Sequence, residues 1–274
     1  MTTSVFDLLR CPVCGLDGET DADKKRFYCH GKKQHSFDFA KSGYLNLCLS
    51  AKAGDLKEAV RARSAFLEEG YYLPLSNEIN SILSEIVAES VLDAGCGEGY
   101  YTNRMAQVAK AVLGADLSKF GVEKAAKTAK SNATNAFFAV ASLFELPVAD
   151  ASFDAVTNLF APCCESEFLR VLKPGGHLIL VGAGEQHLMG LKKVLYDTQY
   201  LNPERNDLPK EMELVEKRNL HTTISVKGND MIRALFSMTP YYWRTSPSDS
   251  QKLDDLEILE TEIDFDIYIY RKAL

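Results

Sequence analysis

Short apolar runs alternate with amphipathic stretches along residues 89–274. Runs of strand length, the last with alternating apolar positions, lie at residues 91–93, 111–115, 136–141, 153–159, 177–181 and 261–270. Helices are expected between them at residues 100–109, from Ser118 to about Lys130, and at 165–172. This alternation predicts an α/β fold with a doubly wound parallel sheet. Residues 173–176 are expected to form a turn, and the polar stretch 202–219 an irregular insertion that faces the substrate.

Two helices are predicted upstream of the first strand. Asp55 and Glu58 have the spacing of an N-cap and its capping-box partner, for a helix that ends near Glu69. A stripe of apolar residues then repeats at helical spacing: Ile79, Ile82, Leu83, Ile86 and Val87. These patterns divide the chain into a front module at residues 1–50, a helical linker at 51–88 and a larger domain at 89–274.

Composition places the chain among globular proteins with a sizeable core. Of its 274 residues 46% are hydrophobic and 25% are charged. No apolar run approaches the length of a membrane span, so no membrane partner is expected. The first residues lack the basic and apolar sections of a signal peptide, and the seven cysteines are an odd number. A reducing cytoplasm is therefore the expected location, where clustered cysteines bind metal more often than each other.

The net charge of −7 is unevenly distributed. Residues 1–65 hold eleven Lys/Arg against eight Asp/Glu, whereas the remainder holds twenty against thirty. The basic residues concentrate at 24–26, at 32–33, and at Lys41, Arg61 and Arg63. Such a face is compatible with phosphate contacts, and solvated loops explain it equally well.

The loop after the first predicted strand carries glycines at 95, 97 and 99, directly before a helix. Glycine lets a ligand lie against the backbone, and the free N–H groups of a helix start point outward. A dinucleotide-binding loop has the spacing G-x-G-x-x-G, and Asp93 and Glu98 would repel its pyrophosphate. These carboxylates suit S-adenosylmethionine, which carries a sulfonium, an ammonium and ribose hydroxyls. Asp116 ends the next strand, where it can accept hydrogen bonds from ribose hydroxyls, as the acidic residue of dinucleotide folds does. The whole pattern resembles that of class I methyltransferases.

Cysteines and a histidine in the front module have the spacing of a structural metal site. Cys11 and Cys14 form a Cys-x-x-Cys knuckle, and Cys29 follows fifteen residues later. One histidine would complete a closed Cys₃His set for zinc, and His35 fits better than His30, whose chelate with its neighbour would be strained. The polar flanks disfavour a redox role for the knuckle. Asp38 is a candidate acceptor for the ligand imidazole.

Aromatic, basic and amide groups interleave over residues 39–47. Such a mixture can stack on bases and contact phosphates. It can equally form the apolar seam between two domains, which is the favoured interpretation for Tyr44 and Leu47.

These features together resemble the bacterial 23S rRNA (guanine-N1)-methyltransferases of the RlmA type, over nearly the whole chain. The resemblance rests on residues 11–14, 35–38, 40–44, 62–67, 70–75, 93–102, 160–163, 187–189, 238–240 and 243–244. It implies zinc on Cys11, Cys14, Cys29 and His35. It implies cofactor contacts from Tyr72, Gly97, Glu98 and His187, while Asp93, Gly95 and Asp116 follow from the wider methyltransferase pattern. This chain departs from the family in having five residues between Cys29 and His35 where three are usual, which keeps His30 as a competitor.

The resemblance implies a Rossmann-like class I methyltransferase that methylates guanine N1 in a hairpin loop of 23S ribosomal RNA, and it favours a homodimer. Asn158 is a candidate to hydrogen-bond the base and Phe160 to stack on it, while the catalytic base is not identified. Pro162-Cys163 supports an alternative, an RNA cytosine-C5 methyltransferase with Cys163 as nucleophile. A small-molecule methyltransferase and a non-enzymatic zinc adaptor are further alternatives.

Overall fold

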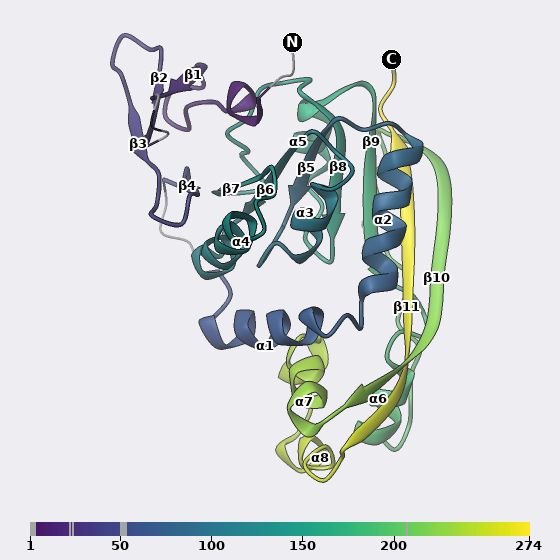
Figure 1. Ribbon diagram of the computed structural model, residues 1–274. Coiled ribbons are helices and arrows are strands. Elements are labelled where there is room, and N and C mark those ends of the chain that lie inside the picture. The colour runs from purple at the N-terminus through teal and green to yellow at the C-terminus, as the bar shows by residue number, and fades with distance from the viewer. Residues whose placement is uncertain (1–3, 22, 24, 50–53, 207) are drawn as a thin grey trace.

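A single eight-stranded sheet organises the protein in the computed structural model, which describes residues 4–21, 23, 25–49, 54–206 and 208–274 (Figure 1). The strands follow the order β10-β11-β9-β8-β5-β6-β7-β4. Their bounds are β4 Leu45–Asn46, β5 Ser90–Ala94, β6 Ala111–Asp116, β7 Ala136–Val140, β8 Phe153–Leu159, β9 Leu172–Ala183, β10 Glu213–Lys227 and β11 Ile258–Arg271. Strands β4 to β9 pair in parallel, and β11 and β10 add an antiparallel edge. The predicted doubly wound α/β fold is confirmed.

Helices surround this sheet, as the wound topology requires. They are α1 Lys57–Glu68, α2 Leu73–Glu85, α3 Tyr100–Met105, α4 Lys119–Ser131, α5 Glu165–Val171, α6 Met189–Leu195, α7 Asn229–Ser237 and α8 Pro247–Gln251, with 3-10 turns η1 Val5–Leu8 and η2 Pro240–Trp243. The central strands bury every residue of β5 and nearly every residue of β6, because helices cover both faces. In Figure 1, α1 crosses below the carboxyl ends of the strands and lies beside α7. The strand order reverses beside β5, so the crevice at its carboxyl end is the expected ligand site.

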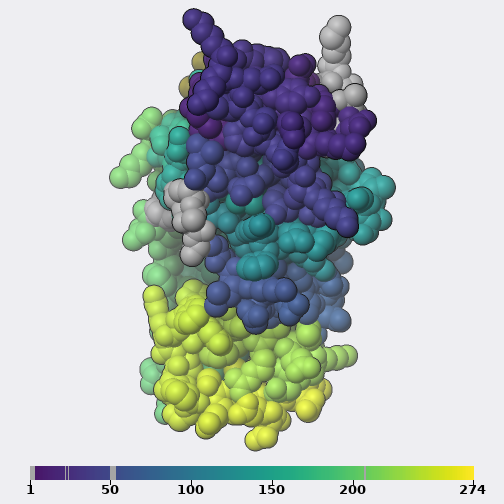
Figure 2. All heavy atoms as spheres, turned by 90° about the vertical axis from the view of Figure 1, so that its left-hand side faces the viewer, coloured from purple at the N-terminus to yellow at the C-terminus, as the bar shows by residue number. Residues whose placement is uncertain are grey.

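The N-terminal residues up to Asp38 form a small unit around an antiparallel sheet, which we call the front unit. Its strands are β1 Gly18–Thr20, β2 Arg26–Cys29 and β3 Ser36–Asp38, in that order. The chain then enters the main sheet, because β4 pairs with β7. Tyr44 and Leu47 are buried at this junction, so the favoured seam interpretation is confirmed. Figure 2 shows this unit at one end of the molecule and the yellow-green region of α7 and α8 at the other.

The division at residues 50 and 51 lies outside the described residues, and the boundaries of the front module and the linker stay predictions. Two observations bear on the division. Strand β4 falls inside the predicted front module and yet belongs to the main sheet. Phe66 and Leu67 of the predicted linker lie in the same apolar core as the large domain.

Several predicted elements differ from those observed. Residues 173–176, predicted to be a turn, lie within β9. They form an irregular part of that strand, where the pairing with β8 shifts from Phe153–Leu172 to Ala155–His177. Residues 213–219, predicted to be irregular, begin the long strand β10. That strand is mostly exposed and mixes charged, polar and apolar residues, so it lacks the alternating apolar pattern of a half-buried strand. The helix predicted over residues 100–109 ends at Met105.

Two predictions about the upstream helices are wrong. The N-cap of α1 is Leu56, and the Asp55 carboxylate makes an ion pair with Arg63 instead of capping the helix. Val87 does not join the apolar stripe of α2, because it follows the helix with a φ of 53° and is 75% exposed. Ile79, Ile82 and Leu83 are buried as expected.

Among the helices that the structure describes, none combines the length and the apolar character needed to cross a bilayer.

Candidate active site

The glycine loop after β5 has the backbone conformation that its sequence requires. Gly95, Gly97 and Gly99 have φ values of 91°, 52° and 76°. The N–H of Gly95 donates to the carbonyl of Ala115 at 2.8 Å, which holds the loop against the end of β6. A Cβ on Gly95 would lie only 2.4 Å from the Cβ of Ala161. Glycine therefore serves both the left-handed conformation and the close approach of a neighbouring loop.

A cavity of about 530 Å³ lies against this loop. Six of the seven predicted cofactor residues line it: Tyr72, Asp93, Gly95, Gly97, Glu98 and Asp116. The seventh, His187, is not among its described lining residues. Phe144 and Phe160 also line the cavity and are half exposed there. The structure thus brings residues from five separate stretches of the sequence to the crevice beside β5.

Asp93 is a buried carboxylate at the end of β5. It accepts hydrogen bonds from the hydroxyls of Thr102 at 2.5 Å and Thr157 at 2.9 Å. Burial raises the pKa of the Asp93 carboxyl to about 6, although both hydroxyls favour its charged form. The group is therefore ionised at neutral pH at a cost to folding stability.

Asp116 holds the glycine loop to the start of α4. Its carboxylate accepts from the N–H of Gly97 at 3.0 Å and from the N–H of Ser118 at 2.7 Å. Burial raises the pKa of Asp116, and these two donors oppose that shift. The side chain stays at the cavity wall, where ribose hydroxyls can donate to it.

Arg63 lies between two acidic groups of the cavity. Its Nε donates to Glu98 at 2.6 Å, and its Nη1 donates to Asp55 at 2.8 Å. The side chain is 27% exposed, so Arg63 does not belong to an open basic face as the sequence analysis expected. Burial raises the pKa of Glu98, and the positive charge of Arg63 lowers it in part.

Tyr72 and His187 make a buried pair at the side of the cavity. The N–H of Asp264 donates to Nδ1 of His187 at 3.2 Å, which leaves Nε2 to carry the proton. That Nε2 lies 3.5 Å from the Tyr72 hydroxyl. Burial lowers the pKa of His187 to about 4, so the ring is neutral at physiological pH. Tyr72 lines the cavity and His187 lies behind it as a support.

The loop after β8 carries the two candidate substrate residues. Asn158 is fully buried, and its Nδ2 donates to the carbonyls of Ala94 at 2.9 Å and Pro162 at 3.3 Å. This amide therefore ties the loop to the end of β5. Phe160 has a φ of 56°, lies 5.4 Å from the ring of Phe265, and is 48% exposed in the cavity. A strained, exposed aromatic residue at a ligand cavity is suited to contact a substrate.

The predicted metal ligands converge in the front unit. One donor atom from each of Cys11, Cys14, Cys29 and His35 lies within 4.8 Å of all the others. The Cys14–Cys29 sulfurs are 3.6 Å apart, and Nδ1 of His35 is 3.6 Å from Cys11 and 3.5 Å from Cys29. A tetrahedral zinc ion with bonds of about 2.3 Å to sulfur spaces its ligands by roughly this amount. The donor set and its spacing fit a structural Zn²⁺.

Two predictions about the surroundings of the metal site are now decided. His30 is about half exposed and lies near Asp17 and Glu19, at 3.6 and 3.8 Å, so it does not compete with His35. Asp38 accepts from Nε of Arg26 at 2.7 Å and does not support the ligand imidazole. Burial raises the pKa of the Cys29 thiol, but the N–H groups of Gly31 and His35 and side-chain hydrogen bonds outweigh it and lower that pKa to about 6. The thiolate that zinc requires is therefore favoured.

The polar groups that line the cavity are chemically suited to S-adenosylmethionine. Carboxylates at Asp93, Glu98 and Asp116 match an ammonium and ribose hydroxyls, and Gly97 leaves its backbone accessible. A pyrophosphate would meet only repulsion from these groups.

Comparison with known proteins agrees with this geometry. Residues 87–230 match the family described as a methyltransferase domain. A protein of Bacillus subtilis (strain 168), YxjB, provisionally named as a 23S rRNA (guanine-N1)-methyltransferase, is 30% identical over 282 residues, which cover 97% of this chain and 98% of that protein. The chain belongs to this methyltransferase family. The 23S rRNA (guanine(748)-N(1))-methyltransferase of Streptomyces fradiae is 29% identical over 91% of this chain and 90% of its own. S-adenosylmethionine is accordingly the cofactor of this fold.

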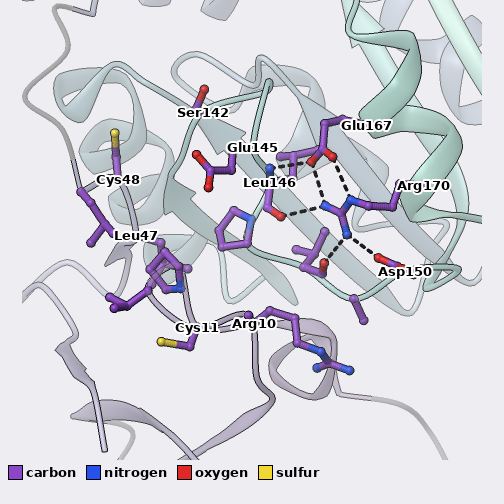
Figure 3. A pocket seen from close by; sticks show the side chains of 17 residues that line it. Arg10, Cys11, Leu47, Cys48, Ser142, Glu145, Leu146, Asp150, Glu167 and Arg170 are labelled. Carbon is purple, nitrogen blue, oxygen red and sulfur yellow. Dashed lines mark hydrogen bonds and ion pairs between the residues drawn. The ribbon is translucent and has the colours of Figure 1, made fainter. Parts of the chain in front are cut away.

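The methyltransferase has a second large hollow, of about 910 Å³, where the front unit meets the main domain (Figure 3). Figure 3 shows Arg170 joined by dashed lines to Glu167 and Asp150. These ion pairs are 2.8 and 2.7 Å long. Arg10, the other arginine in the described lining of this hollow, donates to the carbonyls of Asp7 and Leu9.

Other parts of the predicted basic face are also neutralised in this methyltransferase. Lys25 pairs with Asp23, and Arg26 pairs with Asp38. Lys24 lies outside the described residues. The basic excess of the front sequence therefore overstates the free positive charge on that surface.

The sequence analysis does not assign the charged residues Arg63 and Asp55 to the methyltransferase cavity, which both of them line. A signal for Arg63 was present, because it lies on the same face of α1 as the buried Val60 and Leu67, at spacings of three and four. An arginine on an apolar stripe needs a partner in the interior. Asp55, read as a helix cap, is that partner together with Glu98.

We expect Asp93→Asn to raise the free energy of unfolding at pH 8 by about 2 kcal/mol while it weakens cofactor binding. The native pKa lies above the unfolded one, so the proton favours the folded state at low pH and that stability is lost as the pH rises through about 6. The neutral amide avoids this loss, and its advantage should shrink towards pH 4. Urea unfolding of the wild type and the variant at pH 4.5 and 8 measures the stability gain and its dependence on pH.

Asp154→Asn is the matched control for this prediction. Burial raises the pKa of Asp154, but Lys173 and Ser90 outweigh it and lower the pKa, so this variant should lose stability at pH 8. An Asp93→Asn protein that loses as much stability at pH 8 as Asp154→Asn would contradict the assignment of a costly buried charge.

Proposed function

We propose that this methyltransferase transfers a methyl group to N1 of a guanine in a hairpin loop of 23S ribosomal RNA. The observation that carries the proposal is the likeness over nearly the full length to proteins named as 23S rRNA (guanine-N1)-methyltransferases. A metal-ligating front unit joined to the methyltransferase domain is consistent with an RNA substrate. An RNA substrate of the ribosome would place the protein in the cytoplasm. A homodimer stays a prediction from the resemblance.

We propose that Tyr72, Asp93, Gly95, Gly97, Glu98 and Asp116 hold the cofactor, with His187 supporting Tyr72. Bound S-adenosylmethionine supplies an electrophilic methyl group on a sulfonium. Asp116 would accept the ribose hydroxyls, and the backbone at Gly97 would accept close contact. Tyr72, with its hydroxyl set by the neutral His187 ring, would donate to a polar group of the cofactor.

Phe160 and Asn158 have different proposed roles on the substrate side of the cavity. Phe160 would stack on the target guanine, because its ring is half exposed in the cavity and is held by Phe265. Asn158 would act as a positioning residue that keeps residues 160–162 in place, since its Nδ2 donates to two backbone carbonyls. Guanine N1 carries a proton that must leave, and residues 158–164 contain no Asp or Glu to take it. The base must be unpaired to expose N1, which favours a loop.

The test is methyl transfer from labelled S-adenosylmethionine to 23S rRNA fragments and to ribosomal subunits. We expect label on N1 of one guanine, mapped by mass spectrometry, and no label with Asp116→Ala. Cys163→Ser should keep turnover within about threefold, because Cys163 is not among the described lining residues and packs at the edge of an apolar cluster. Label on cytosine that Cys163→Ser abolishes would overturn the proposal in favour of the thiol mechanism. Label in a metabolite pool without RNA would indicate a small-molecule enzyme.

A further inference from the structure

The guanidinium of Arg63 occupies an unusual position for an arginine on a helix. It lies on the buried face of α1 and lines the cofactor cavity. Its Nη2 would be 3.1 Å from a Cβ on Gly97, so this nitrogen lies over the backbone of the glycine loop. A Cβ there would stand in the space that the glycine leaves free for a ligand.

The charges around the cavity are strongly unbalanced. Its described lining holds the carboxylates of Asp55, Asp93, Glu98 and Asp116. Arg63 is the one cationic side chain in that described lining. An anionic group of a ligand would thus meet repulsion everywhere in the cavity except beside Arg63.

The partners of Arg63 leave one donor group for a ligand. Glu98 takes Nε at 2.6 Å and Asp55 takes Nη1 at 2.8 Å. No hydrogen bond from Nη2 occurs within the described part of the chain. The two carboxylates hold the planar guanidinium in one orientation, which preorganises Nη2 beside Gly97.

S-adenosylmethionine carries one anionic group, the carboxylate of its amino-acid part. The sulfonium, the ammonium and the ribose hydroxyls are matched by the acidic lining, and this carboxylate is not. We propose that Arg63 binds the cofactor carboxylate through Nη2 and thereby makes the site selective for cofactors that retain this group. The proposal rests on the cofactor assigned above and is independent of which RNA or other acceptor is methylated.

A contact with an RNA phosphate is the competing role for Arg63. An exposed side-chain fraction of only 27% disfavours it, because a phosphate-binding arginine has to reach out of the surface. Arg61, on the exposed side of the same helix, is placed for such a contact.

Calorimetric binding of two ligands to the full chain, without RNA, tests the assignment. S-adenosylhomocysteine contains the carboxylate, and 5′-methylthioadenosine lacks the whole amino-acid part. Arg63→Gln should lower the affinity for S-adenosylhomocysteine by about 30-fold or more and the affinity for 5′-methylthioadenosine by less than threefold. Arg61→Gln, the matched control, should change neither.

Equal losses for both ligands would overturn the proposal, because Arg63 would then only maintain the shape of the cavity. So would an unchanged affinity for S-adenosylhomocysteine. Because Arg63→Gln leaves Glu98 buried without its cation, Arg63→Gln/Glu98→Gln provides a charge-balanced second variant, which should bind intact and decarboxylated S-adenosylhomocysteine about equally. In the wild type, decarboxylated S-adenosylhomocysteine should bind at least tenfold more weakly than the intact ligand, and equal binding would also contradict the assignment. None of these measurements depends on methyl transfer to RNA.

Discussion

Cys29→Ser is expected to release the metal and unfold the front unit while the cofactor cavity keeps its function. A structural zinc site contributes about 10 to 16 kcal/mol to the fold that holds it, and a unit of fewer than about 40 residues has too small a core to fold without such help. The cavity takes none of its described lining from the front unit, so S-adenosylhomocysteine should bind within about threefold of the wild type. Elemental analysis, limited proteolysis and calorimetry measure the three effects.

His35→Asn and His30→Gln separate the two histidines. Nδ1 of His35 lies 3.5 and 3.6 Å from two of the cysteine sulfurs, so its loss should deplete zinc as Cys29→Ser does. His30 lies outside the cluster, and its variant should retain one zinc per chain. A zinc-free chain whose front unit resists protease as well as the loaded protein would show that the metal is dispensable for this fold.

Gly95→Ala is expected to abolish cofactor binding, with a loss of more than 100-fold in affinity for S-adenosylhomocysteine. The new Cβ would lie 2.4 Å from the Cβ of Ala161, and the position has a φ of 91°. The loop at residues 160–162 cannot retreat freely, because Asn158 ties Pro162 to the end of β5. We therefore expect the glycine loop to shift, with a stability loss of several kcal/mol measured by denaturant unfolding, of which about 1 to 2 reflects the φ alone.

Gly43→Ala isolates the contribution of the backbone conformation. Gly43 has a φ of 99°, and nothing lies within 4 Å of the Cβ that it would acquire. This variant should lose about 1 kcal/mol of stability and bind the ligand normally. If Gly95→Ala matches Gly43→Ala in stability and in ligand affinity, the close packing of Gly95 against Ala161 is not required for cofactor binding.

The parts of the site that could be predicted from sequence are those whose chemistry is local. The glycine spacing at 95, 97 and 99 specifies a loop with positive φ, and the apolar run before it specifies a buried strand. The zinc ligands could also be predicted from the sequence, because thiolate and imidazole groups at knuckle spacing have few other uses in a reducing environment. His35 was favoured over His30 by the strain of adjacent ligands, and the structure agrees.

The parts that sequence reasoning missed depend on partners far away in the chain. Asp55 has the local pattern of a cap, but an arginine eight residues later offers a stronger interaction across the cavity. Strand β10 exposes most of its side chains and mixes charged, polar and apolar residues without a regular alternation, and only its long antiparallel pairing with β11 makes it a strand. The sequence makes Asn158 a candidate to hydrogen-bond the substrate, and it gives no sign that its Nδ2 donates to the distant carbonyl of Ala94 and to that of Pro162. Tertiary pairing outweighs local pattern in each case.

The two margins of the main sheet are protected by different means. At one margin β10 is mostly exposed and bears charged groups such as Lys217 and Arg218, which discourage a second molecule from adding its own strand. At the other margin β4 shields β7 with only two residues, Leu45 and Asn46. The front unit is tethered directly to that short shield. We therefore expect a chain without its zinc to self-associate more readily through the bared margin of β7, which would link the solubility of the protein to its metal content.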